Sequence, residues 1–362
     1  MNNTLSLLLH RSLLTLLILF CQLSGASSVG AAKPAVAPVE ELRFLNWPGY
    51  IDPEVVKEFE HRFNSQVTMS YFESDDARDD ILVDSDGQNY DVVVINRSKF
   101  SVYRRRGWLA PLTEDEIPNI RHIERRWLES HADAVGYGVP YSWGTTGIAY
   151  RADLVPEPIT RWQQILSPDE ALRGKIIMVN TARDVVGMAL MALGYSASSI
   201  DLQHLEAAEA LLLAQKPYVK SYSYVSLSKQ SELVDGRAWA TMIYNGDALT
   251  LQAFNPNIVY VVPEEGSELW IDYLVVLSAS PHQSLAKAFI NFVNEPRNAA
   301  RIARFVNYAT PNKAAEEWLP TEFLQDALIY PSAEILKRCE SYSEWPPRVA
   351  KQVNSIFSQL LQ

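Results

Sequence analysis

The segment at residues 42–59, LRFLNWPGYIDPEVVKEF, decides the fold. Its apolar beginning predicts a buried strand, and an aromatic loop, WPGY at 47–50, follows. A helix start comes next, because Asp52 is a favoured N-cap and Pro53 a favoured first helical residue. Open α/β sheets bind ligands at the carboxyl ends of their strands. The segment therefore predicts an α/β fold whose first loop holds a ligand rather than reacting with it.

Strand and helix signals alternate along the rest of the chain. The run DVVVI at 91–95 is typical of a parallel strand covered on both faces. The expected strands are 67–71, 91–95, 175–179, 238–244, 258–262 and 270–277, and the expected helices are 100–106, 183–193, 201–214, 284–293 and 299–305. This alternation predicts largely parallel sheets. The length favours two lobes with a cleft between them, the chain crossing near 143–147 and 270–275.

Residues 1–31 have the features of a secretory signal peptide. An apolar run at 12–20, short for a bilayer span, follows Arg11, and small residues come after it. Cleavage is expected near Ala26 or Ala31, before a Pro/Ala linker at 32–40. The alternative is an uncleaved membrane anchor.

Charge and cysteine content narrow the classes of partner and of fold. The formal net charge is −11, which argues against nucleic acid, because phosphates need a basic face. Removal of the leader leaves Cys339 alone, so the core, and not an internal disulfide, is expected to hold the fold.

No catalytic or metal-binding motif stands out. The chain has no G-x-S-x-G elbow, no H-E-x-x-H and no P-loop. We therefore expect no enzyme, no metal and no cofactor. A secreted hydrolase remains the alternative of another class, because a fold can bring distant carboxylates together.

Several short segments instead pair an aromatic ring with a carboxylate. The sharpest is Trp270-Ile271-Asp272, since residues two apart in a strand share a face. Such a set suits a flexible polycation, whose ammonium groups need carboxylates and whose methylenes gain from burial between rings. The segments are WPGY at 47–50, Asp184 at a helix start, Tyr244 with Asp247, Trp270 with Asp272, and Tyr308 in a loop.

Each of these residues also has a structural interpretation. Asp184 and Asp247 could cap or line helix starts, and single aromatic residues are commonly core residues. The acids at 75–76 and 79–80 are expected on a solvated helix face.

In this order and spacing, the segments resemble the spermidine/putrescine-binding periplasmic proteins of bacterial polyamine uptake. The resemblance covers nearly all of the mature chain. The segments that carry it are LRFLNWPGYI at 42–51, YDVVV at 90–94, VPYSWGTTGIAY at 139–150, ARD at 182–184, MALMALGYS at 188–196, MIYNGDA at 242–248, LWIDYLVV at 269–276 and NYATPNKAA at 307–315.

The resemblance implies a two-lobed periplasmic-binding-protein fold of type II, a venus flytrap with its ligand cleft between the lobes. One lobe would comprise residues 41–143 plus 274–320, and the other 144–273 plus 321–362. The ligand residues implied by the match are Trp47, Tyr50, Asp184, Tyr244, Asp247, Trp270, Asp272 and Tyr308.

The sequence departs from the family pattern inside the implied site. Tyr244 stands where the family usually has Trp, and Thr181 replaces an acid three residues before Asp184. This pattern also resembles the norspermidine-sensing periplasmic proteins that regulate biofilm formation. A monomer in the periplasm is expected, signalling on binding norspermidine or spermidine to an inner-membrane cyclic-di-GMP enzyme of the GGDEF/EAL type. The alternative is delivery of the polyamine to an ABC permease.

Overall fold

Strand β1 (Glu40–Asn46) and helix α1 (Pro53–Phe63) open the part of the chain that the computed structural model describes, residues 39–362. The expected signal peptide at 1–31 and most of the linker at 32–40 lie outside these residues. The helix begins as its sequence predicts, because the side chain of Asp52 accepts a hydrogen bond from the backbone N–H of Glu54 at 2.9 Å.

The strands form one continuous ladder in the order β2-β1-β3-β9-β4-β7-β5-β6, with β8 paired to β4. All of the strands expected from the sequence are present. Two further strands, β4 and β6, were not expected. The strands after β1 are β2 (Ser65–Tyr71), β3 (Val92–Asn96), β4 (Val139–Arg151), β5 (Ile176–Met178), β6 (Val219–Tyr222), β7 (Ala240–Tyr244), β8 (Ile258–Val261) and β9 (Leu269–Val276).

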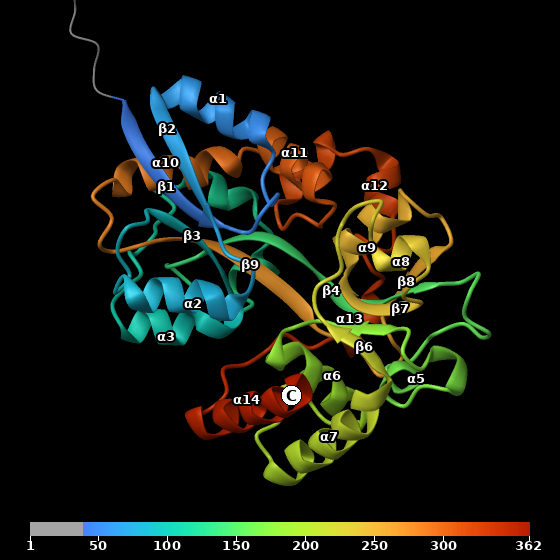
Figure 1. Cartoon of the computed structure of the whole chain (residues 1–362). Helices are drawn as coiled ribbons and strands as arrows, with labels where there is room; N and C mark the ends of the chain where they lie inside the picture. Colours follow the sequence, from blue (N-terminus) through green and yellow to red (C-terminus); the bar gives the residue numbers. More distant parts are fainter. Residues whose placement is uncertain (1–38) are drawn as a thin grey trace, which may run out of the picture. The chain divides into compact units, whose positions relative to one another are not determined.

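The prediction of largely parallel sheets is wrong in the middle of this ladder. The pairs β1–β2, β1–β3, β5–β6 and β5–β7 are parallel, whereas β3–β9, β4–β9, β4–β7 and β4–β8 are antiparallel. The reason is that β4 and β9 carry the chain between the two halves of the sheet. Residues up to Thr145 of β4 pair with β9, and from Thr146 onward β4 pairs with β7. The expected crossing at 143–147 therefore lies within one strand (Figure 1).

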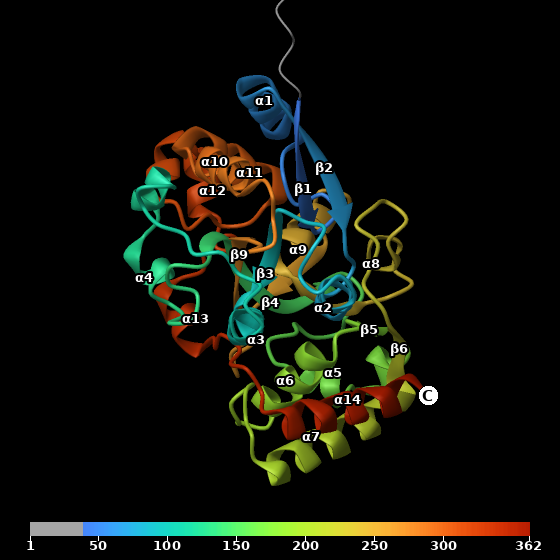
Figure 2. The same ribbon diagram turned by 90° about the vertical axis from the view of Figure 1, so that its left-hand side faces the viewer.

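Helices cover both halves of the sheet. In Figures 1 and 2, α6, α7 and α14 lie side by side against one half, and α1, α10 and α11 lie together on the other. No helix among residues 39–362 is both long and apolar enough to cross a membrane. The remaining helices are α2 (Asp75–Asp84), α3 (Phe100–Arg105), α4 (Arg125–Leu128), α5 (Gln163–Leu166), α6 (Ala182–Ala192), α7 (Leu202–Gln215), α8 (Glu232–Asp235), α9 (Asn245–Gln252), α10 (Gln283–Val293), α11 (Pro296–Val306), α12 (Thr321–Gln325), α13 (Ala333–Arg338) and α14 (Pro347–Leu361).

The buried apolar side chains divide into a first and a second core. The first core takes its residues from 42–143 and 271–309, and the second from 148–260 and 342–360. The lobe boundaries expected from the sequence stay a prediction. Ile329 packs in the first core, although residues 321–362 were expected in the second lobe. After α11 the chain packs on the first core at Ile329 and Leu336 and on the second at Leu328, and its buried residues join the second core from Tyr342 onward.

Candidate functional site

A row of aromatic rings joins the two cores. Tyr50 and Tyr308 belong to the first core, and Tyr224 packs against the second. Each ring of the row neighbours the next. The distances between ring centroids are 5.9 Å for Tyr50–Tyr308, 4.8 Å for Tyr308–Trp270, 6.2 Å for Trp270–Tyr244 and 5.8 Å for Tyr244–Tyr224. Four of the residues predicted from the sequence therefore lie in one continuous row. Tyr224, at the end of β6, was not predicted.

Three carboxylates lie at the hydroxyl ends of tyrosines in this row. The hydroxyl of Tyr50 donates to Asp272 Oδ2 at 2.9 Å, and that of Tyr244 donates to Asp184 Oδ2 at 3.1 Å. Asp247 accepts a short hydrogen bond from the hydroxyl of Tyr224. The structure thus brings the three predicted aspartates to the same row of rings.

Backbone geometry places these side chains. Trp270 and Asp272 lie two residues apart on β9 and share a face of the sheet, as the sequence predicts. Asp184 and Asp247 lie in the first turns of α6 and α9, whose N-cap residues make no side-chain capping bond. Because their Oδ2 atoms accept from tyrosine hydroxyls, these two aspartates do more than cap helices.

Burial disfavours the charged forms of these carboxylates. It raises the pKa of Asp247 to about 6, and burial together with the nearby charge of Asp75 raises the pKa of Asp272 to about 7. The pKa of Asp184 is raised by the same two causes, and the hydrogen bond from Tyr244 offsets part of the rise. Each aspartate would therefore gain from a cation brought beside it.

Two further acids adjoin the row and were missed as site residues. Glu268, just before β9, is 8% exposed, and its Oε2 accepts from Thr146 Oγ1 at 2.9 Å. Burial, and then the charge of Asp184, hold the pKa of Glu268 well above its ordinary value. The sequence does carry a signal for Glu268: it lies two residues before Trp270, so in an extended chain the two side chains share a face.

Asp75 corrects the prediction of a solvated face at 75–76. It is half-buried in the first turn of α2, where it pairs with the fully buried Arg78 and accepts from Asn96 Nδ2. Its charge acts on Asp184, Glu268 and Asp272. Asp79 also pairs with Arg78, whereas Asp76 and Asp80 are exposed as expected. The sequence did not reveal this arrangement, because Arg78 lies among several acids on the same helix and such a run is typical of a solvated face.

Trp47 lies apart from the row. Its ring packs on Phe72 at 4.4 Å between centroids, and it is half-buried in the loop between β1 and α1. Phe72 in turn lies 5.5 Å from the guanidinium of Arg78. Trp47 thus lies on the side of Asp75, and its role in ligand binding stays a prediction.

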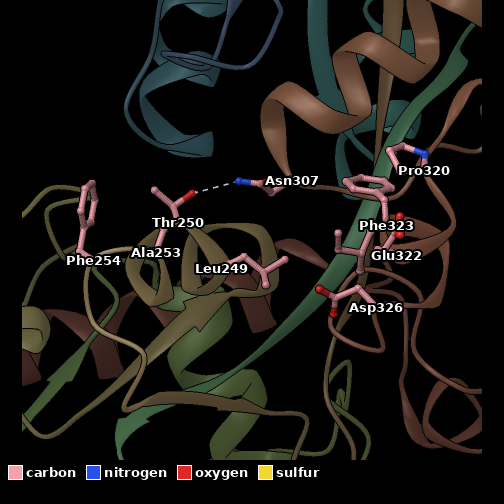
Figure 3. A pocket seen from close by; sticks show the side chains of 10 residues that line it. Leu249, Thr250, Ala253, Phe254, Asn307, Pro320, Glu322, Phe323 and Asp326 are labelled. Carbon is pink, nitrogen blue, oxygen red and sulfur yellow. Dashed lines mark hydrogen bonds between the residues drawn. The ribbon is translucent and has the colours of Figure 1, made fainter.

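One surface pocket lies outside the row. It measures about 550 Å³ and is lined by residues of α9, α12 and the end of α11, including Thr250, Asn307 and Asp326 (Figure 3). None of the aromatic residues of the row lines it. The row itself is packed, with Tyr50 at 8% and Tyr308 at 6% exposure. Tyr244, Trp270 and Asp272 are partly exposed, so the row is closed to solvent only in part.

The family follows from comparison with known sequences. The profile of the bacterial extracellular solute-binding proteins matches residues 54–331. The chain belongs to this family. It is 28% identical, over 94% of its length and 95% of the relative's, to a spermidine/putrescine-binding periplasmic protein of Escherichia coli (strain K12). It is 30% identical, over 80% of each chain, to a norspermidine sensor of Vibrio cholerae.

A solved structure supports the same fold for this solute-binding protein. The spermidine/putrescine ABC transporter substrate-binding protein from Streptococcus pneumoniae superposes with a TM-score of 0.76 at 30% identity, covering 89% of this chain and 98% of that one. The two-lobed periplasmic-binding-protein fold predicted from the sequence is confirmed. Among residues 39–362, no group of His, Cys, Asp or Glu is arranged to hold a metal ion.

Proposed function

We propose that this solute-binding protein is a periplasmic polyamine receptor and not an enzyme. One observation carries the proposal. Asp184, Asp247, Asp272 and Glu268 are drawn together along the aromatic row, and none of them makes an ion pair within 4.0 Å among the described residues. Their raised pKa values are what such isolation produces.

A polyamine supplies what these groups need. An unpaired buried carboxylate is costly, and a charge-assisted hydrogen bond from an ammonium removes most of that cost. Methylene segments between the nitrogens would pack on the rings of Trp270, Tyr244 and Tyr308. An ammonium over a ring face adds about 0.5–2 kcal/mol. A single hard cation would leave the rings unused.

Ligand binding would be coupled to closure of the lobes. Tyr50 and Asp272 lie with the first core, whereas Asp184 and Tyr224 lie with the second. A ligand that contacts both sets binds the closed form more tightly, and it shifts the population by that difference in affinity. Closure is then the signal that a membrane partner could detect.

We infer that the output is signalling to an inner-membrane cyclic-di-GMP enzyme controlling biofilm formation. The relative from Vibrio cholerae is called a norspermidine sensor, which supports a role in sensing, and the membrane enzyme is our proposal for its partner. The second candidate is delivery to an ABC permease, and the transporter protein from Streptococcus pneumoniae supports it. An adjacent gene for a GGDEF/EAL membrane protein would favour signalling, and adjacent permease and ATPase genes would favour transport.

The test of polyamine binding uses the mature chain. Putrescine, cadaverine, norspermidine and spermidine are titrated by calorimetry at pH 7.5, and melting temperatures are measured with and without each. We expect saturable binding of at least one polyamine and a melting temperature that rises with its concentration. No binding of any of the four at millimolar concentration would overturn the proposal. Turnover of an amine or amide substrate would favour a secreted hydrolase instead.

A further inference from the structure

Glu268 faces the same way as the two binding residues of β9. It lies two residues before Trp270 and four before Asp272, and it joins the ladder through its carbonyl, which accepts from Thr146 N at 3.2 Å. Alternate residues of an extended chain share a face, and each advances by about 3.3 Å. Glu268 therefore extends the row of binding groups by one further step, away from Asp272.

Hydrogen bonds across the sheet link Glu268 to Asp184. The carboxylate of Glu268 accepts from Thr146 Oγ1 at 2.9 Å, and Thr146 is the register partner of Tyr244. The hydroxyl of Tyr244 donates to Asp184 at 3.1 Å. β9, β4, β7 and the start of α6 thus bring two carboxylates to one place, and the charge of Asp184 raises the pKa of Glu268.

Arg183 compensates the charge of this pair only in part. The guanidinium of Arg183 lies over the rings of Tyr342 and Trp345, at 4.5 Å and 4.2 Å from their centroids. Within residues 39–362, no ion pair joins Arg183 to Asp184 or Glu268, and its buried Nε has no hydrogen-bond partner. Arg183 lowers the pKa of both acids but pairs directly with neither, and two such acids can share a proton or bind a further cation.

We propose that Glu268 is a specificity-determining residue which, with Asp184, holds one ammonium of a triamine. This rests on the proposed function. Three positions for nitrogen then lie along the row: the pair Asp184 and Glu268 beside Tyr244, Asp272 beside Tyr50, and Asp247 beside Tyr224. Each position has its own tyrosine hydroxyl as a donor.

The charge balance favours a triamine over a diamine. Four carboxylates face the row, while Asp75 is already paired with Arg78. A trication with one proton shared between Asp184 and Glu268 leaves no carboxylate without a partner. A dication leaves one position with a buried negative charge or an added proton, and either reduces affinity.

The test compares wild type with Glu268→Gln for spermidine, norspermidine and putrescine, by calorimetry at pH 7.5. Glu264→Gln serves as control, since Glu264 is an exposed acid in the loop before β9. We expect Glu268→Gln to reduce the ratio of triamine to putrescine affinity by at least about tenfold. Glu264→Gln should leave the ratio within about twofold, and Glu268→Asp should restore part of it.

The outcomes separate this inference from the proposed function. If wild type binds no polyamine, the proposed function fails. If wild type binds and Glu268→Gln keeps the same triamine preference, whether or not both affinities fall, the assignment of Glu268 is overturned. Glu268→Gln is expected to fold, because it replaces a buried acid with a neutral side chain of the same shape. Its melting temperature without ligand checks this, and Glu268→Asp is the second variant.

Discussion

At the scale of residues, the site is built from pairs in which a tyrosine hydroxyl holds a carboxylate. Asp272 with Tyr50, Asp184 with Tyr244 and Asp247 with Tyr224 repeat this unit. The hydroxyl orients the carboxylate without neutralising it, since tyrosine keeps its proton at neutral pH. Burial raises the pKa of these tyrosines well above the ordinary value. The carboxylates thus stay ready to accept an ammonium in a fixed geometry.

Replacement of one carboxylate of this set should reduce affinity strongly. We predict that Asp272→Asn weakens binding of the preferred polyamine by at least about tenfold, because an ammonium loses its counter-charge in a buried position. Calorimetry at pH 7.5 measures the effect. Asp80→Asn is the matched control, since Asp80 is an exposed acid on α2. Equal small effects of both changes would contradict the placement of the site.

A candidate site residue could be predicted only where its neighbours in the sequence carry a signal. Trp270 and Asp272 could be predicted as candidates, because a carboxylate near a Trp in an otherwise apolar strand is unusual. Asp75 could not, because its partner Arg78 lies among acids that suggested a solvated helix face. Tyr224 could not be predicted, because only the folded chain brings this residue, two positions after β6, into contact with Asp247 of α9.

At the scale of elements, the short helix α9 and the loop after α11 fit each other closely. A Cβ added at Gly246 would lie 2.5 Å from Cε1 of Tyr308 and 2.8 Å from the carbonyl oxygen of Asn307. The absence of a side chain at Gly246 therefore lets the ring of Tyr308 reach the row. This contact fixes Asp247, one residue further, relative to that ring.

We predict that Gly246→Ala lowers the free energy of unfolding by about 1–3 kcal/mol, because the added methyl group overpacks a backbone contact. It should also weaken polyamine binding by displacing Tyr308. Denaturant unfolding and calorimetry measure the two effects. Gln252→Ala, at the other end of α9, is the control and should leave binding unchanged, since its side chain bonds the carbonyl of Ile258. Wild-type affinity in Gly246→Ala would show that Tyr308 is not part of the site.

Element prediction succeeded where local signals agreed and failed where tertiary pairing decides. The start of α1 follows from Asp52 and Pro53 alone. The longest strand, β4, was not predicted as a strand, because Pro140, Gly144 and Gly147 weaken strand propensity. The strand forms because both its ends find partners, and Gly144 is needed there: a Cβ would lie 2.4 Å from the ring of Trp270.

At the scale of the whole molecule, the buried acids couple stability and binding to pH. The pKa of Asp247 is about 6 and that of Asp272 about 7 in the folded chain, against about 3.9 for an unfolded Asp. Between these values the folded state holds more protons than the unfolded state. Protonation of these two carboxyls therefore stabilises the folded state. This contribution is fully present below about pH 4 and is lost as pH rises through 6 to 7.

We predict that, without ligand, the contribution of these groups to stability falls between pH 5 and pH 8. Melting temperatures across this range measure it. The double variant Asp247→Asn, Asp272→Asn is the comparison, and its profile should fall less steeply, because amides do not titrate. Identical profiles for the two proteins would contradict the raised pKa values.

Ligand binding should release protons. An ammonium beside Asp272 lowers its pKa, so a carboxyl that is partly protonated at pH 6.5 ionises in the complex. Calorimetry in two buffers with different ionisation enthalpies gives the number of protons released. We expect a positive number that decreases at pH 8 and in Asp272→Asn. Absence of release at pH 6.5 would mean that Asp272 is ionised before binding.

The global architecture was predicted better than its sheet. Two lobes and a crossing near 143–147 follow from chain length and element order. The antiparallel pairing of β9 with β3 and β4 could not be predicted, because a short apolar run does not indicate the direction of the strand beside it.

The raised pKa values of the acids in the row make the proposed polyamine binding depend on acidity. In an acidic medium these carboxyls keep their protons, and the proposed receptor then needs more polyamine for the same occupancy than at neutral pH. Its response therefore depends jointly on how much polyamine is present and on how acidic the environment is.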